Sequence, residues 1–270
     1  MRKQNWATAV AGVVLSVASA SAQAQASAAE GIARYREMLQ DGNPAELVVA
    51  RGEELWKAKR GPKNVSLEQC DLGLGPGVLE GAYVQAPRYF ADVGKVMDIE
   101  ARIVHCMITL QGFRFEDLAK APFSTEQRTP EVVSLVTYVA GQSRDMKIAA
   151  PQSNAQERDA YGLGEAIFYF RAGPWDFSCA SCHGEDGKRI RTQNLPNFTN
   201  PRTAPRGFIG WPGYRMTGGV MHTLQWRMND CFRQQRFPEP GYVSDTVTAL
   251  LTFMAVNANG AVYKGPGIKR

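Results

Sequence analysis

The stretch Cys179–His183, which reads Cys-Ala-Ser-Cys-His, constrains this chain more than any other feature. Two cysteines two residues apart with a histidine directly after them have the spacing of c-type haem attachment. Two thiols add to the two vinyl groups of one porphyrin edge, and the next residue can then place its imidazole on the iron. We therefore predict one covalent haem c, attached through Cys179 and Cys182, with His183 as the proximal iron ligand. A zinc half-site, which would need further Cys or His ligands, and a dithiol site, which would need no histidine, remain the alternatives.

The N-terminus has the pattern of a secretory signal peptide. Basic residues 2–3 precede an apolar run over about residues 7–20, and small-x-small cleavage sites follow, the last ending at Ala26. The apolar run is too short for a membrane span, and no later segment reaches the roughly 18 apolar residues that a span needs. We expect residues 1–26 to be removed on export to the periplasm. Covalent haem attachment, which occurs outside the bacterial cytoplasm, agrees with that location.

The net charge bears on the kind of partner that the chain binds. The chain carries a formal charge of +5, which becomes +3 when the basic residues 2–3 leave with the signal peptide. An excess of this size gives no indication of nucleic-acid binding, but it permits an anionic substrate or an acidic redox partner.

Apolar residues recur at helical spacing along most of the chain, whereas strand signals are weak. We expect a mainly α fold of short helices packed around a flat haem. The predicted helices cover two segments within 30–60 around a turn at Asp41–Pro44, then Met97–Leu110, Pro130–Ala140, Asp159–Phe170, and approximately 219–236 and 244–256.

An internal repeat relates the two halves of the chain. Four segments recur in the same order, which chance does not easily supply. They pair Gly52–Trp56 with Gly164–Phe168, Cys70 with Cys182, Arg102-x-x-x-Cys106 with Arg227-x-x-x-Cys231, and Val133–Ala140 with Thr248–Ala255.

The repeat predicts two tandem cytochrome-c-like domains from a duplication, with haem only in the second. At the shared offset of 112 residues, Leu67 stands where the second half has Cys179, and Asp71 stands where it has His183. The first half has therefore lost its haem motif. We place the N-terminal domain at residues 27–150 and the C-terminal domain at residues 151–270.

The remaining cysteines follow from this arrangement. Cys70 and Cys106 hold equivalent positions around an absent haem in an oxidising compartment, so we expect a disulfide between them. Two unpaired buried thiols are the alternative. Cys231 is then the one cysteine left over.

The distal ligand of the haem is open between several residues. The candidates after the motif are Met216, Met221, His222, Met228 and Cys231. Position favours Cys231, because its repeat partner Cys106 is drawn to the place of the missing haem, and a thiolate is a sound iron ligand. The alternative is a methionine ligand, with Cys231 as a small core residue.

Arg227 precedes Cys231 by one helical turn, so both project from one face of the helix. Its guanidinium would stabilise a thiolate and offer an anion a bidentate contact. The alternative is an arginine that pairs with a haem propionate, with Asp230 or with Glu239.

Taken together, these residues resemble the SoxA subunit of the SoxAX cytochromes, of the single-haem type. The resemblance covers nearly the whole mature chain. It is carried by Tyr35–Leu39, Asn43–Leu47, Cys70, Cys106, Cys179–His183 and Arg227–Cys231.

The resemblance implies a periplasmic L-cysteine S-thiosulfotransferase in thiosulfate oxidation. It makes His183 the proximal ligand, Cys231 the distal ligand, carried as a persulfide, and Arg227 the active-site arginine. The family joins thiosulfate to a cysteine of the carrier protein SoxYZ, and electrons leave through the haem to the small cytochrome SoxX, its heterodimer partner.

Electron counting agrees with this reading. Joining a thiol to thiosulfate releases two electrons, whereas a haem accepts one at a time, so a partner haem or a second turnover must accept the other electron. Arg236, Arg191 and Lys188 could add to the positive field around the substrate, with solvated surface charge as the alternative for each.

Three other functions remain in competition. A plain electron-transfer cytochrome would have a methionine ligand and no need of Arg227. A thiosulfate dehydrogenase resembles this architecture but uses two haem motifs, and this chain has one. A structural partner that only docks a second cytochrome would not need the intact Arg-x-x-x-Cys.

Overall fold

The computed structural model describes residues 42–119, 129–190 and 193–269. Pro44–Arg270 forms one compact unit. The predicted signal peptide, the first predicted helix around residues 30–40 and Arg191 lie outside the described residues. None of the helices in the described ranges is long and apolar enough to cross a membrane.

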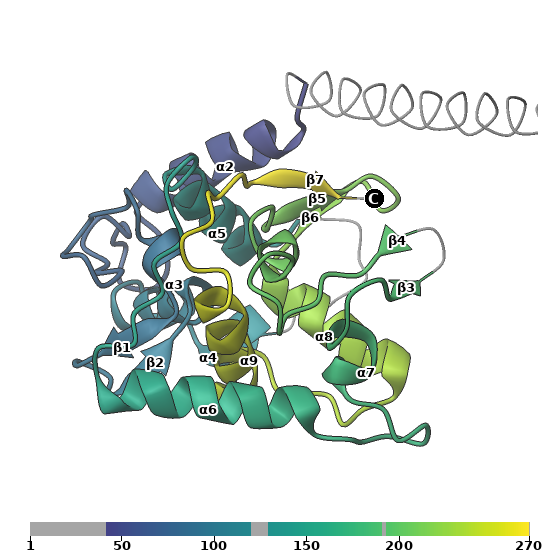
Figure 1. The fold of residues 1–270 in the computed structure, drawn as a ribbon. Coiled ribbons are helices and arrows are strands. Elements are labelled where there is room, and N and C mark those ends of the chain that lie inside the picture. The colour runs from purple at the N-terminus through teal and green to yellow at the C-terminus, as the bar shows by residue number, and fades with distance from the viewer. Residues whose placement is uncertain (1–41, 120–128, 191–192, 270) are drawn as a thin grey trace, which may run out of the picture. The chain divides into compact units, whose positions relative to one another are not determined.

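The fold is mainly helical, with short strands between the helices (Figure 1). The helices are α2 (Ala45–Lys57), α3 (Ile99–Thr109), α4 (Phe115–Ala119), α5 (Glu131–Gly141), α6 (Ala155–Tyr169), α7 (Cys179–His183), α8 (Leu224–Gln235) and α9 (Asp245–Val256). The strands are β1 (Arg88–Phe90), β2 (Lys95–Met97), β3 (Arg189–Ile190), β4 (Gln193–Asn194), β5 (Gly213–Arg215), β6 (Val220–His222) and β7 (Gly267–Lys269). The 3₁₀ turns are Tyr83–Gln85 and Ala204–Gly207.

Capping residues set the helix starts. Asp98 accepts from the backbone amides of Glu100 and Ala101 at the start of α3. A capping box between Asn154 and Glu157 begins α6 four residues earlier than the sequence pattern indicates. These side chains satisfy amides that have no partner within their own helix.

One helix prediction is wrong at its start. The segment expected to be helical from about residue 219 instead pairs as strand β6 with β5, and α8 begins only after the N-cap Thr223. Gly219 has a φ of +66°, which suits the turn of a hairpin and not a helix. The apolar spacing in this stretch therefore belongs to two elements.

Both halves are built on a close crossing of two helices. Helix α2 packs against α5, and α6 packs against α9, as Figure 1 shows for the second pair. Gly52 lies against the backbone of Ser134 and the Cβ of Tyr138, while Gly164 lies against the backbone of Ala249 and the Cβ of Phe253. Only glycine permits helix backbones to approach this closely.

The two halves also share an order of elements. In the first half the hairpin β1–β2 leads into α3, and in the second the hairpin β5–β6 leads into α8. Ala150, the last residue of the predicted N-terminal domain, is held in place, because its backbone and the side chain of Asn259 exchange two hydrogen bonds. The domain boundary itself stays a prediction.

Buried polar groups join the two halves at the starts of α3 and α8. Asp98 accepts from the side chains of Gln225 and Thr248, and Glu100 accepts from Tyr242 at 2.8 Å. A cavity of about 30 Å³ lies here. Burial, with Asp98 nearby, raises the pKa of Glu100 to about 8, so its carboxyl is protonated at neutral pH.

The glycine contact predicts opposite effects for two neighbouring positions. Gly164→Ala would force α6 away from α9 and should lower the free energy of unfolding by about 1–3 kcal/mol. Gly162→Ala in the same helix meets no atom within 4 Å and should be neutral or raise it by up to about 1 kcal/mol. Urea unfolding measures both, and an equal response would contradict the close crossing.

Glu100 predicts a pH dependence of stability. The unfolded state ionises Glu100 near its ordinary pKa, whereas the folded state keeps the proton up to about pH 8. Its contribution to stability is therefore complete below about pH 4.5 and is lost as the pH rises to about 8. Relative to wild type, Glu100→Gln should gain stability across this window in thermal unfolding, while Glu54→Gln, at an exposed carboxyl, should not.

Candidate haem and sulfur site

Helix α7 presents the paired cysteines of the second half. Ser178 and Ser181 form a capping box at its start, in which the side chain of each serine accepts a hydrogen bond from the backbone amide of the other. Cys179 and Cys182 are free thiols and are partly buried. Covalent attachment to a porphyrin edge needs two such thiols on one short turn, and these residues fit that requirement.

His183 is oriented for metal binding. Its Nδ1 lies 2.8 Å from the carbonyl oxygen of Pro196, and its ring packs 4.9 Å from that of Phe198. Since a carbonyl only accepts, Nδ1 carries the proton and Nε2 keeps its lone pair. Burial, together with the charge of Arg227, lowers the pKa of His183, so the ring is neutral at neutral pH. A neutral, oriented imidazole fits the proximal position of a haem.

Helix α8 supplies the other predicted site residues. Cys231 is a free, partly buried thiol, and Arg227 precedes it by one turn. Burial raises the pKa of the Cys231 thiol, whereas the charge of Arg227 opposes that rise. Cys231 interacts electrostatically with Cys182, and Arg227 with His183. The structure therefore places the two site residues of α8 near the motif residues of α7.

Arg227 pairs with Asp230, which is one of the partners expected for it. Its Nη1 lies 2.8 Å from Oδ2 of Asp230, a buried carboxylate. Arg233 donates to the other oxygen at 2.7 Å, and Arg215 lies 3.7 Å from Oδ2. No spacing along the sequence indicates Arg215, because this residue comes from a separate element, β5. Burial tends to raise the pKa of Asp230, but hydrogen bonds from Gln234 and Arg233, together with the charges of Arg227 and Arg233, hold it below its usual range.

The other cationic candidates lie elsewhere or have partners. The guanidinium of Arg236 lies over the ring of Trp175 at 5.1 Å. Lys188 forms an exposed ion pair with Glu185. Arg191 lies outside the described residues.

The alternative distal ligands lie in β6, in α8 and in the loop after β5. Met216 is exposed beyond β5, while Met221 in β6 and Met228 in α8 are buried. His222 stacks on Trp226 at 3.5 Å, and burial lowers its pKa to about 4.

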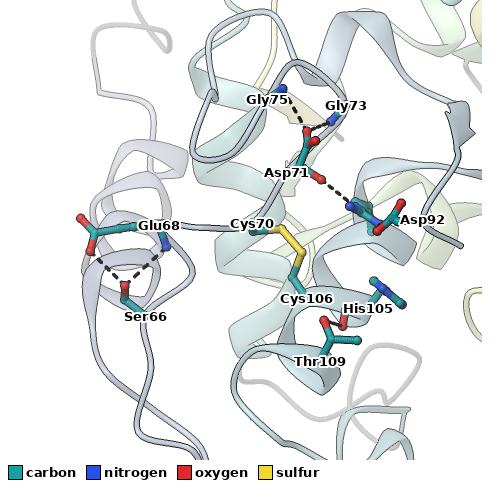
Figure 2. The surroundings of a disulfide bond; sticks show 11 residues. Ser66, Glu68, Cys70, Asp71, Gly73, Gly75, Asp92, His105, Cys106 and Thr109 are labelled. Atoms are coloured by element: carbon teal, nitrogen blue, oxygen red, sulfur yellow. Dashed lines mark hydrogen bonds and ion pairs between the residues drawn. A yellow bond between two sulfur atoms is a disulfide. The ribbon is translucent and has the colours of Figure 1, made fainter.

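The corresponding region of the first half is closed. The predicted disulfide between Cys70 and Cys106 is present, with Cα atoms 5.8 Å apart (Figure 2). Leu67 is fully buried, and the carboxylate of Asp71 accepts from the amides of Gly73 and Gly75. Without thiols or an imidazole, these residues do not fit a covalent haem.

Arg102 shows how the equivalent arginine is used where there is no motif. It donates to the carbonyl of Asp71 and to the carboxylate of Asp92, and it lies 4.3 Å from the ring centre of Phe90. The side chain is 5 % exposed, whereas that of Arg227 is 33 % exposed. Arg102 is thus buried and bound to neighbouring groups, whereas the side chain of Arg227 is partly exposed to solvent.

Comparisons with known proteins agree with these features. Residues 51–148 match the family model described as the SoxA/TsdA cytochrome c domain. The L-cysteine S-thiosulfotransferase subunit SoxA of Hydrogenophilus thermoluteolus is 47 % identical over 91 % of this chain and 90 % of its own length. That of Hydrogenobacter thermophilus is 29 % identical over the full length of both.

A solved structure is similar as well. The crystal structure of SoxXA from P. pantotrophus matches with a TM-score of 0.71 and 25 % identity, over 88 % of this chain and 84 % of that one.

The disulfide predicts that stability and haem content are separable. Replacing Cys70 and Cys106 together by alanine removes a cross-link between positions 36 residues apart and should cost about 2–4 kcal/mol in urea unfolding. The haem per chain, measured by the pyridine haemochrome, should not change. Reductant should lower the midpoint of the wild type but not that of the variant, and a loss of haem would contradict the assignment.

Proposed function

Because this chain belongs to the SoxA family of L-cysteine S-thiosulfotransferase subunits, with 47 % identity to a member over 91 % of its length, we propose that it joins thiosulfate to a carrier-protein cysteine at Cys231. The carrier would be SoxYZ-like and the place the periplasm. One observation carries the proposal: a free cysteine and a partly exposed arginine, one turn apart on α8, lie within electrostatic range of the motif residues Cys182 and His183.

One haem c would be held by the second half. Cys179 and Cys182 would attach it, and His183 and Cys231 would ligate its iron. When bound, the haem supplies a one-electron acceptor beside the reacting sulfur. The free thiols and the hydrogen bond that orients His183 support this assignment.

The reaction is an oxidative conjugation. Thiosulfate and a carrier thiol form one new sulfur–sulfur bond, giving the carrier S-thiosulfonate with the release of one proton and two electrons. The S–H bond of the carrier breaks, and no bond of thiosulfate does. Because a haem accepts one electron at a time, a haem held by Cys179, Cys182 and His183 would take up one electron, and a partner haem or a second turnover would take up the other.

Arg227 would bind the substrate. Thiosulfate is a dianion with oxygens that suit the planar donors of a guanidinium. The pair with Asp230 uses one nitrogen of Arg227 and leaves other N–H groups for the anion. Holding thiosulfate there places its outer sulfur near Cys231, and this positioning lowers the entropy cost of bond formation.

The two halves would descend from a duplication, with residues 27–150 and 151–270 as the two domains. The matched glycine crossings and the matched hairpin–helix order support this origin. In the first domain a disulfide takes the place of the cofactor, so only the second domain would take part in the chemistry.

The second electron acceptor would be a SoxX-like small cytochrome bound as a heterodimer. The similar solved structure is that of a SoxXA complex. Two haems, one in each subunit, would match the two electrons released in each turnover.

Electron paramagnetic resonance of the ferric protein tests the ligand assignment. A low-spin thiolate-type signal should be present in wild type and lost in Cys231→Met, because the substitution exchanges an anionic sulfur for a neutral thioether. Met228→Leu, a volume-conserving change on the same helix, should keep the signal. An unchanged His/Met-type spectrum in Cys231→Met would instead indicate a plain electron carrier.

Activity completes this test. Arg227→Lys keeps the charge but loses the planar donors, so kcat/KM for thiosulfate should fall about tenfold to a hundredfold. A fall in wild-type activity on removal of sulfane sulfur by reductant, seen as a mass loss confined to the peptide with Cys231, would add support for a persulfide.

A further inference from the structure

We propose that Arg215 is a second thiosulfate-binding residue, and that Asp230 holds it and Arg227 on either side of one small anion site. This inference rests on the proposed function, because the anion concerned is the substrate bound beside Cys231.

The two guanidiniums meet at one atom. Nη1 of Arg227 lies 2.8 Å, and Nη1 of Arg215 lies 3.7 Å, from the same Oδ2 of Asp230. Their separation therefore cannot exceed the sum of these distances, which a tetrahedral oxyanion can span. Because the Asp230 side chain is only 6 % exposed, one buried carboxylate orients both arginines.

Arg215 has donors to spare. Its contact with Asp230 is too long for a hydrogen bond, and in the part of the chain that the structure describes its guanidinium donates to no other group. The side chain is 25 % exposed. Its guanidinium also lies 5.5 Å from the ring centre of Trp226, whose ring His222 covers by stacking. The arginine is thus held in place while its N–H groups stay available.

The local charge matches the substrate. Arg215, Arg227 and Arg233 surround the single carboxylate of Asp230, which leaves a net charge of +2 for a thiosulfate dianion. Arg233 bonds the other oxygen of Asp230 and is 56 % exposed, so it adds to the field more than to direct binding. Without Arg215 the remaining charge would fall short of the dianion.

The first half supplies an internal comparison. The last residue of β1, before the hairpin turn, is Phe90, and the last residue of β5 is Arg215. Phe90 covers the guanidinium of Arg102, which is buried and bound to Asp71 and Asp92 in the half with the disulfide. Where the free Cys231 stands, this cover is replaced by a second cation. The second cation is therefore present only in the half that the proposed function assigns to thiosulfate binding.

The test uses the holoenzyme in complex with its partner cytochrome. The dissociation constant of thiosulfate is measured by calorimetry on the oxidised complex without carrier, and KM and kcat are measured with carrier. Arg215→Gln should raise the dissociation constant and KM about tenfold with a smaller change in kcat. Arg206→Gln removes the same charge from an exposed position outside the site and should change neither constant.

Retention of the wild-type paramagnetic resonance spectrum shows that the variant keeps its fold around the haem. Should Arg215→Gln fail to fold, Arg215→Lys decides, since it keeps the charge but loses the planar donors and should still raise KM with kcat held. Equal dissociation constants for Arg215→Gln and Arg206→Gln, or for Arg215→Lys and wild type, would overturn the inference. If Arg227→Lys and Cys231→Met were also without effect, the proposed function would fail with it.

Discussion

The close crossing of helix pairs is the constraint on which the rest of this structure depends. Gly164 lets α6 and α9 touch backbone to backbone, and Gly52 does the same for α2 and α5. A side chain at either glycine would push apart helices that are distant in sequence. Because α7 follows α6 after a short connection, the crossing also sets the position of the paired cysteines relative to α9.

Polar contacts between the two halves of the chain then position helix α8. Asp98 and Gln225 come from the starts of α3 and α8, and their buried hydrogen bonds join α8 to the first half. Helix α8 carries Arg227 and Cys231 at fixed positions beyond this anchor. The first half therefore helps to position α8, the helix that carries Arg227 and Cys231, and this is a physical reason for keeping that half closed by a disulfide.

Charge distinguishes the two halves more than shape does. Both place an arginine one turn before a cysteine, but Arg102 is spent on Asp71, Asp92 and Phe90, whereas Arg227 leans on a single buried carboxylate and stays open to solvent. A buried carboxylate with several arginines around it keeps them ordered and leaves a positive excess. Such an excess beside a sulfur atom is suited to binding a sulfur oxyanion.

The sequence by itself determined the features that depend on local spacing. Helices α3, α5, α6 and α9 and the disulfide of Cys70 with Cys106 all follow from periodicity or the internal repeat. Only the tertiary structure decided that residues 220–222 form a strand, because hairpin pairing with β5 outweighs a weak helical pattern. It alone brought Arg215 to Asp230, since the two belong to different elements, and no spacing along the chain encodes a contact made by packing a hairpin against a helix.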